Sequence, residues 1–163
     1  MKIAVYTKST LTAHPVRTSL IAALSAMPGM ELKNILPGED IPSDCERVLA
    51  FGGDGTMLDA AVRSARRGIP LLGVNIGNLG FLTQLDSSVS AEEVAAALKS
   101  GGVKRRMLLE CKAEGASFLA LNDVVVKSSS TRPVSVELYV DGQFSDAYRS
   151  DGVIVATPTG STA

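Results

Sequence analysis

Val48-Leu49-Ala50-Phe51-Gly52-Gly53-Asp54-Gly55-Thr56 is the stretch of sequence that decides the fold. Its first four residues are apolar and typical of a buried strand, and its glycines allow a tight turn with close backbone approach. A helix is predicted to begin at Thr56, because Thr56 and Asp59 have the spacing of a capping box. A strand that turns directly into a helix leaves unpaired N–H groups at the helix start, so this turn is suited to bind an anion.

The sequence on either side repeats the alternation of strand and helix signals. Strands are predicted at residues 3–6, 32–36, 48–51 and 71–74. Helices are predicted at residues 15–27, 56–68 and 90–98, and the last opens with a second capping box, Ser90 with Glu93. This alternation is typical of a parallel sheet covered by helices. We therefore expect an open, Rossmann-like α/β domain over residues 1–101.

The pattern changes beyond Gly102, where only strand signals remain. Strands are predicted at residues 108–113, 118–127, 134–140, 143–148 and 153–156. Asp141-Gly142 between two alternating runs predicts a hairpin. We expect a β-rich, sandwich-like second domain over residues 102–163, and an incomplete one, because the sequence stops at Ala163 inside a polar loop.

Composition excludes several classes of function. Sixteen basic and seventeen acidic residues give a net charge of −1, which provides no field to recruit nucleic acid or an anionic membrane. No segment reaches membrane-spanning length, and the first apolar run is too short for a signal peptide. Two cysteines without metal-binding spacing are typical of a cytoplasmic protein with reduced thiols. Any phosphate must therefore be bound by local backbone and a few placed cations.

Asp54 indicates chemistry beyond phosphate binding, since a carboxylate and a phosphate repel each other. It fits a group that accepts a proton from an attacking hydroxyl, or that helps to hold a phosphate-bridging metal ion. The alternative is a plain helix cap in a tight turn. The loop is neither a P-loop, because GxxxxGK[ST] is absent, nor a dinucleotide fingerprint, because Leu58 stands where the third glycine belongs.

Three further polar clusters follow. Residues 73–83 come after the next strand, so they should lie beside the first loop on the same sheet edge, unless they form only a flexible connection. Asn122-Asp123 interrupts an apolar run and indicates a bulge or a site, because burying such groups unpaired costs about 1–3 kcal/mol each. Residues 149–152 and 157–163 are rich in hydroxyls and suit either a polar ligand or a surface turn.

Together these motifs resemble the NAD kinase family. The resemblance covers essentially the whole chain in order: Gly-Gly-Asp-Gly-Thr at 52–56, Asn-Leu-Gly-Phe-Leu-Thr at 78–83, Asn-Asp at 122–123, and Asp-Gly with Thr-Pro-Thr-Gly-Ser-Thr-Ala at 151–163. It implies an α/β domain followed by a β-rich domain, with the dinucleotide bound between them. It also implies transfer of the ATP γ-phosphoryl group to the 2′-hydroxyl of the adenosine ribose of NAD, giving NADP, with Mg²⁺ as the expected cation. Members of the family tend to form homo-oligomers, so a dimer or a tetramer is expected.

Carried over position by position, the resemblance makes Asp54 the catalytic proton acceptor. Asp123 stands where Glu is more usual, which shortens its reach, and family members continue past Ala163 with a Tyr and the rest of the β-rich domain. The positions implied to contact NAD or ATP are Gly53, Asp54, Gly55, Thr56, Asn78, Asn122, Asp123, Arg149, Asp151, Thr159, Ser161, Thr162 and Ala163.

Two other functions remain open at this point. A lipid kinase similar to diacylglycerol kinase shares the first glycine motif but gains no support from the later ones. A truncated, non-catalytic nucleotide-binding domain is the other alternative. Lys104-Arg105-Arg106 is interpreted as a solvated linker, and His14, the only histidine, as a helix-start or surface residue.

Overall fold

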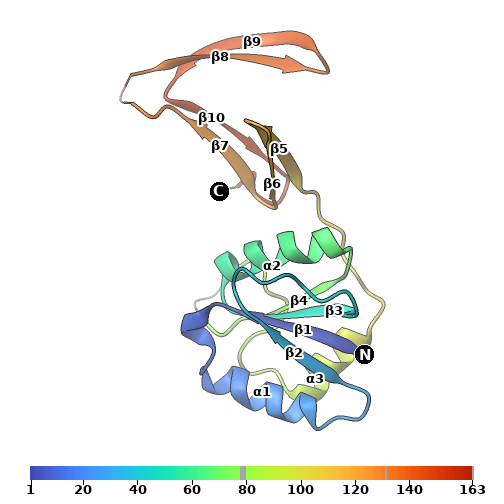
Figure 1. Ribbon diagram of the computed structural model, residues 1–163. Coiled ribbons are helices and arrows are strands. Elements are labelled where there is room, and N and C mark those ends of the chain that lie inside the picture. Colours follow the sequence, from blue (N-terminus) through green and yellow to red (C-terminus); the bar gives the residue numbers. More distant parts are fainter. Residues whose placement is uncertain (78–79, 131, 163) are drawn as a thin grey trace. The chain divides into compact units, whose positions relative to one another are not determined.

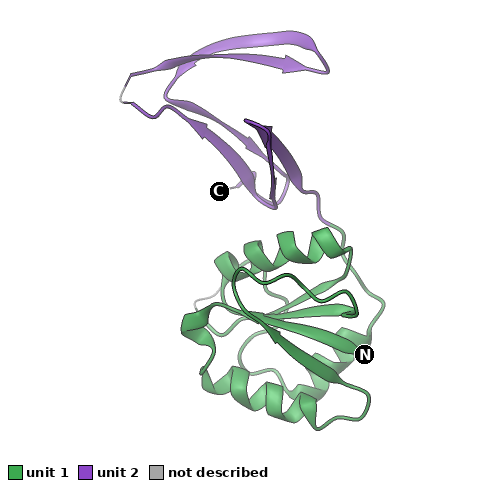
Figure 2. Cartoon of the chain, in the orientation of Figure 1, with its two compact units in different colours: residues 1–105 green, residues 106–163 purple. Residues whose placement is uncertain are grey.

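The computed structural model describes residues 1–77, 80–130 and 132–162. The chain divides into two compact units, residues 1–105 and 106–163 (Figure 2). The first is an α/β unit, and the described residues of the second form strands but no helix, as the sequence predicts. The domain limits expected at residues 101 and 102 stay a prediction.

The first unit is built on one parallel sheet of four strands in the order β2-β1-β3-β4 (Figure 1). The strands are β1 (Lys2–Thr7), β2 (Glu31–Ile35), β3 (Arg47–Phe51) and β4 (Leu71–Val74), and the helices are α1 (Pro15–Ser25), α2 (Asp54–Arg67) and α3 (Ala91–Lys99), with a short 3₁₀ turn, η1 (Ser9–Leu11). The predicted strands and helices of this unit are thus all present. Their parallel pairing brings the carboxyl ends of all four strands to one edge of the sheet.

The two faces of the sheet carry different cores, because successive side chains of a strand point to opposite sides. Ile3 and Val5 of β1 pack with Leu24 of α1 and with Val94 of α3. Ala4 and Tyr6, the alternate residues of the same strand, pack on the opposite face with residues of α2. Figure 1 shows this layering, with α1 and α3 on one side of the sheet and α2 on the other.

Small residues bring α2 close to its face of the sheet. Ala50 of β3 and Gly73 of β4 lie directly opposite each other in the ladder. A Cβ on Gly73 would lie 2.5 Å from the sulfur of Met57, which is buried on α2. A larger residue at position 73 would therefore push away the helix that begins at the glycine turn.

The predicted start of α2 at a Thr56–Asp59 capping box is wrong. The helix begins at Asp54, its N-cap is Gly53, and no side chain caps it. Thr56 lies buried within the first turn, and Asp59 accepts a hydrogen bond from the Tyr6 hydroxyl. The glycine turn is short enough for the chain to enter the helix two residues earlier than the spacing predicted.

The other predicted helix ends are confirmed. Gly68 ends α2 in the left-handed conformation, with φ of 65°. Ser90 and Glu93 form the predicted capping box at the start of α3. His14 is the N-cap residue of α1, with Pro15 at its first helical position.

The second unit consists of three antiparallel strand pairs. Strand β5 (Leu109–Ala113) pairs with β6 (Ala116–Ala120), β7 (Asp123–Lys127) with β10 (Gly152–Ala156), and β8 (Val134–Val140) with β9 (Gln143–Ser150). The predicted hairpin is confirmed, and Asp141 and Gly142 both have positive φ at its turn. The single strand predicted over residues 118–127 is wrong, because the chain leaves one sheet after Ala120 and enters another at Asp123.

The strand pairs of the second unit leave much apolar surface open. Of its described residues, Leu121 is the one apolar side chain that is buried. The exposed ones come from all three pairs and include Phe118, Val125, Tyr139, Phe144 and Ile154. Packing within this unit is therefore carried mainly by backbone pairing, whereas the first unit has two apolar cores.

Candidate functional site

The glycine turn and the loop after β4 meet through one carboxylate. The Asp54 side chain accepts a hydrogen bond from the backbone N–H of Phe81 at 3.1 Å and another from that of Leu82 at 3.0 Å. The two bonds end on different carboxylate oxygens, so both oxygens are fixed in direction. The structure thus brings together two of the clusters that the sequence places at the same sheet edge.

Gly80 makes this approach possible. A Cβ at position 80 would overlap the carboxylate of Asp54, with Oδ1 as the nearest atom. Asp54 remains partly exposed, although both of its oxygens are bonded. Each oxygen of an ionised carboxylate can accept more than one hydrogen bond, so the group keeps lone pairs for a proton from a ligand.

The plain-cap interpretation of Asp54 does not fit these contacts. The residue occupies the first position of α2, and its side chain makes no capping bond to that helix. It bonds instead to a loop that is 27 and 28 residues further along the chain. The helix dipole stabilises a negative charge near the start of a helix. The Asp54 carboxylate gains this stabilisation although it makes no capping bond.

The glycine turn itself is shaped by Gly52 and Thr56. Gly52 has φ of 156°, and a Cβ there would overlap the side chain of Thr56. Thr56 is 3% exposed, so its side chain fills the space under the turn and is not presented to a ligand. Gly53 is partly buried and Gly55 is exposed, which leaves the backbone of Gly55 open to a ligand.

In the second unit, Asn122 and the hydroxyl-rich loop lie against each other. The N–H of Thr157 donates to the carbonyl of Asn122 at 2.8 Å. A Cβ on Gly160 would overlap the backbone of Asn122, so only glycine fits there. The predicted third and fourth clusters are therefore neighbours, although 35 residues separate Asn122 from Thr157.

Thr157 is the residue that organises this loop, a role that was not predicted from the sequence. Its hydroxyl donates to the carbonyl of Leu121 at 2.6 Å and accepts from the N–H groups of Thr159 at 3.1 Å and Gly160 at 3.2 Å. The side chain is 1% exposed. A Thr followed by Pro-Thr-Gly is a signal for such a turn, in which a hydroxyl binds the backbone two or three residues later.

Asn122 carries an open hydrogen-bonding position. Its Oδ1 is buried and has no hydrogen-bond partner among the described residues. A buried acceptor without a donor costs free energy, and a ligand that donates to it would recover that cost. Asp123, the first residue of β7, follows directly and is partly buried.

The remaining predicted positions are more exposed. Thr159 accepts a hydrogen bond from Nη1 of Arg106 at 3.2 Å, so the last residue of the basic run contacts the hydroxyl-rich loop and does not lie free in a linker. Arg149, Asp151, Ser161 and Thr162 are exposed. Asn78 and Ala163 lie outside the described residues.

A second cluster on α2 links the helix to β1. The Tyr6 hydroxyl donates to Asp59, and Arg63 bonds the same carboxylate at 3.2 Å while its guanidinium lies 5.3 Å from the centre of the Tyr6 ring. Burial, followed by the bond to Asp59, raises the pKa of Tyr6 to about 12. The cluster fixes the helix that begins with Asp54.

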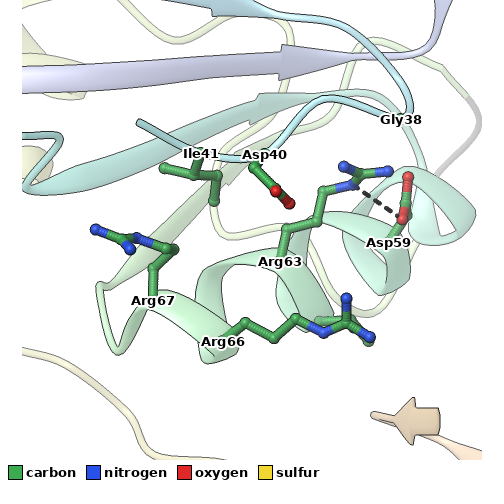
Figure 3. Close-up of a pocket in the computed structure, with 8 residues that line it drawn as sticks. Gly38, Asp40, Ile41, Asp59, Arg63, Arg66 and Arg67 are labelled. Carbon is green, nitrogen blue, oxygen red and sulfur yellow. Dashed lines mark hydrogen bonds and ion pairs between the residues drawn. The ribbon is translucent and has the colours of Figure 1, made fainter. Parts of the chain in front are cut away.

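Asp59 and Arg63 also line a surface pocket of about 270 Å³ that lies along α2 (Figure 3). Figure 3 shows their ion pair, with the side chains of Arg66 and Arg67 further along the helix. The complete lining is Gly38, Asp40, Ile41, Asp59, Val62, Arg63, Arg66 and Arg67. None of the predicted nucleotide-binding residues lines this pocket, so we place no part of the site in it.

A metal ion held by protein side chains alone has no support in the described residues. They contain no group of three or more His, Cys, Asp or Glu side chains that could hold one. Mg²⁺, however, is usually bound by one or two carboxylates together with substrate phosphates. The single carboxylate of Asp54 fits that second arrangement. Among the described residues, no helix is both long and apolar enough to cross a membrane.

Comparison with known proteins agrees with the motifs. The sequence model of the ATP-NAD kinase N-terminal domain matches residues 31–103, and that of the ATP-NAD kinase C-terminal domain matches residues 121–163. The chain is 46% identical over 135 residues to the NAD kinase of Solibacter usitatus, covering 78% of this chain and 47% of that protein. It is 42% identical over 147 residues to the NAD kinase of Pseudomonas putida strain W619, covering 81% and 50%. The chain thus spans about half the length of these curated relatives.

Solved structures give the same result for the fold. An NAD kinase from Archaeoglobus fulgidus in complex with ATP superposes with a TM-score of 0.72 at 26% identity, over all of this chain and 63% of that one. A yeast NADH kinase complexed with NADH has a TM-score of 0.72 at 22% identity, over all of this chain and 59% of that one, and supports the fold alone.

Proposed function

The chain belongs to the NAD kinase family, and we propose that it carries the proton acceptor and nucleotide-binding loops of an ATP-dependent NAD kinase. The reaction transfers the γ-phosphoryl group of ATP to the 2′-hydroxyl of the adenosine ribose of NAD and yields NADP and ADP. Because the chain spans about half the length of its curated relatives, this activity is a proposal for the whole protein.

The observation that carries the proposal is the fixed carboxylate of Asp54 at the carboxyl edge of the sheet. A ribose hydroxyl is a weak nucleophile at neutral pH, so a positioned base contributes about 10²- to 10⁴-fold to the rate. Two backbone N–H groups hold this carboxylate in one orientation, which is what a base requires to meet a bound hydroxyl.

The proposed chemistry balances in a single step. Asp54 takes the proton of the 2′-hydroxyl as the new bond forms between that oxygen and the γ-phosphorus. The bond from the γ-phosphorus to the bridging oxygen breaks at the same time, and ADP leaves with its electron pair. The exposed backbone of Gly55 at the start of α2 faces the phosphates, where N–H groups and the helix dipole stabilise negative charge.

We assign the dinucleotide contacts of the second unit to Asn122, Asp123 and the loop that Thr157 organises. The support is the unpartnered Oδ1 of Asn122, which can accept a hydrogen bond from an amino or hydroxyl group of NAD. Thr159 presents a hydroxyl already bonded to Arg106. The other proposed contacts, from the family motif, are Gly53, Asn78, Arg149, Asp151, Ser161, Thr162 and Ala163.

Mg²⁺ fits this site as an ion that enters on the phosphates of ATP, with Asp54 as the carboxylate that would hold it. When bound, it would neutralise charge on the phosphate oxygens. The roles of Asp54 and of the Gly55 backbone described above are properties of the chain itself.

The deciding experiment offers the whole protein ATP with NAD, with diacylglycerol or with no acceptor. The readout is NADP, detected by an NADP-specific dehydrogenase, together with labelled phosphoryl transfer to lipid. NADP formed with wild-type Asp54, and lost in Asp54→Asn, supports the proposal. Transfer to lipid would support the lipid-kinase alternative, and calorimetric binding of NAD without NADP would support the binding-only alternative.

We also propose that the protein acts in the cytoplasm and as a homo-oligomer, a dimer or a tetramer. The support for the second point is the family, together with the exposed apolar side chains of the second unit, such as Tyr139 and Ile154. Light scattering on the purified protein would measure its mass in solution. A monomer at micromolar concentration would contradict the proposal.

A further inference from the structure

The order of the sheet identifies where a ligand should bind in the first unit. From β1 the chain passes through α1 to β2 on one side, and from β3 it passes through α2 to β4 on the other. Strands β1 and β3 are neighbours, and their helices cover opposite faces (Figure 1). In open parallel sheets, ligands bind beyond the carboxyl ends of two such strands, where the connections diverge.

Two residues leave the sheet side by side at this point. Thr7 pairs with Phe51 in the ladder, so the next residues, Lys8 and Gly52, both pass beyond the same edge. The glycine turn, which follows β3, forms one side of the expected binding position. The other side is formed by Lys8, whose carbonyl accepts the N–H of Leu11 at 2.9 Å in the short 3₁₀ turn and is thereby fixed.

The side chain of Lys8 reaches across to the glycine turn. Its Nζ lies 3.4 Å from where a Cβ on Gly55 would stand. Gly55 is the second residue of α2 and is exposed. The ammonium group of Lys8 therefore lies over the same backbone to which we assign the phosphates.

The ammonium group of Lys8 lies at the start of a helix without an ion-pair partner among the described residues. The start of a helix carries partial positive charge, which disfavours an ammonium group. An anion that fits between the ammonium group and the N–H groups of α2 would be attracted by both, so it would offset their mutual repulsion. With a net charge of −1 for the whole chain, such a local cation is what phosphate binding requires.

We propose that Lys8 is a donor-binding residue of this site, and that its ammonium group contacts phosphate oxygens of ATP above Gly55. This inference rests on the proposed function, because it names the cation that receives the ATP phosphates. Lysine suits the task as a compact charge with three rotatable donors. In this proposal β1, which lies beside β3 in the sheet but far from it in the sequence, leads into a residue of the site.

Calorimetry with ATP and with inorganic tripolyphosphate tests the inference on the intact chain. Lys8→Ala should weaken both ligands about tenfold or more, because a charge-assisted contact is lost. Lys8→Arg should recover part of the affinity, because it restores the charge. Adenosine, which has no phosphate, should bind equally to all variants.

Lys99→Ala is the matched control, because Lys99 is also exposed but lies at the far edge of the sheet. It ends α3, beside Leu98, whose carbonyl accepts a bond from Arg47 at the amino end of β3. This variant should bind ATP as the wild type does. Where NADP is formed, Lys8→Ala should also raise the KM for ATP and leave the KM for NAD unchanged.

The outcomes separate this inference from the proposed function. A wild-type whole protein that binds ATP but makes no NADP counts against the kinase, while the binding data still decide the role of Lys8. Unchanged affinity for ATP and tripolyphosphate in Lys8→Ala would overturn the inference even in an active kinase. So would a wild-type chain that binds neither ligand.

Discussion

Gly80 and Asp54 are packed so closely that a Cβ at position 80 would overlap the carboxylate oxygen Oδ1 of Asp54. The absence of a side chain at one position therefore sets the orientation of the proposed base, which lies 26 residues earlier in the sequence.

Gly80→Ala should displace the Asp54 carboxylate and lower NADP formation about tenfold or more, because small misplacements of a reacting group are costly. Stability should change little, since Gly80 is partly exposed. Gly77→Ala is the control, because a Cβ there meets nothing within 4 Å. Steady-state rates of both variants check the prediction, and equal rates would contradict it.

Asp54→Asn should keep the fold and the affinity for ATP, and lose about 10²- to 10⁴-fold in turnover. The amide has nearly the same shape as the carboxylate but is a far weaker proton acceptor. Glu92→Gln, an exposed acid-to-amide change in the first turn of α3, should leave turnover unchanged. Near-normal NADP formation by Asp54→Asn would remove the role assigned to this residue.

Tyr6→Phe should lower the free energy of unfolding by about 1 kcal/mol at pH 7, because Asp59 loses one of its donors. The pKa of Tyr6 is raised from 10.0 to about 12 in the folded state. The stability that this shift provides is therefore complete below pH 10 and is lost as the pH rises from 10 to 12. Urea unfolding of both proteins across this range should show a steeper fall for the wild type. Tyr139→Phe, an exposed change, serves as the control.

Thr157→Val should weaken NAD binding and destabilise the second unit by about 1–3 kcal/mol, because the change leaves the N–H groups of Thr159 and Gly160 without their acceptor. The volume of the side chain is nearly unchanged, so the effect reports on the hydroxyl. Thr18→Val, on the exposed surface of α1, is the matched control. Calorimetry with NAD and thermal unfolding measure the two effects, and equal affinity in both variants would contradict the first.

Much of the fold could be predicted because its signals are local. The apolar run before Gly52, the Ser90–Glu93 capping box and the Asp141-Gly142 turn each specify a structure within a few residues, and each is confirmed. The start of α2 was missed because Thr56 and Asp59 have partners elsewhere. Thr56 fills the space under the glycine turn, and Asp59 bonds to Tyr6. A spacing rule contains no information on such distant partners.

The same reason explains which parts of the candidate site were missed. Lys8 follows an ordinary strand, and only the pairing of β1 with β3 brings it to the glycine turn. Thr157 looks like one hydroxyl among several, and its role follows from the carbonyl of Leu121 beneath it. The sequence predicts which motifs carry chemistry, whereas the residues that hold those motifs in place depend on strand order.

The two apolar cores of the first unit limit where residues can be inserted into the sequence or deleted from it. Ile3 and Val5 belong to one face, and Ala4 and Tyr6 to the other. Inserting one residue within β1 or β3 would exchange the two sets of side chains and turn the wrong ones toward α2. It would also carry Lys8 or Asp54 past its partner at the sheet edge. Insertions and deletions should therefore be tolerated after β2, around the exposed residues 36–40, and rejected inside the strands themselves.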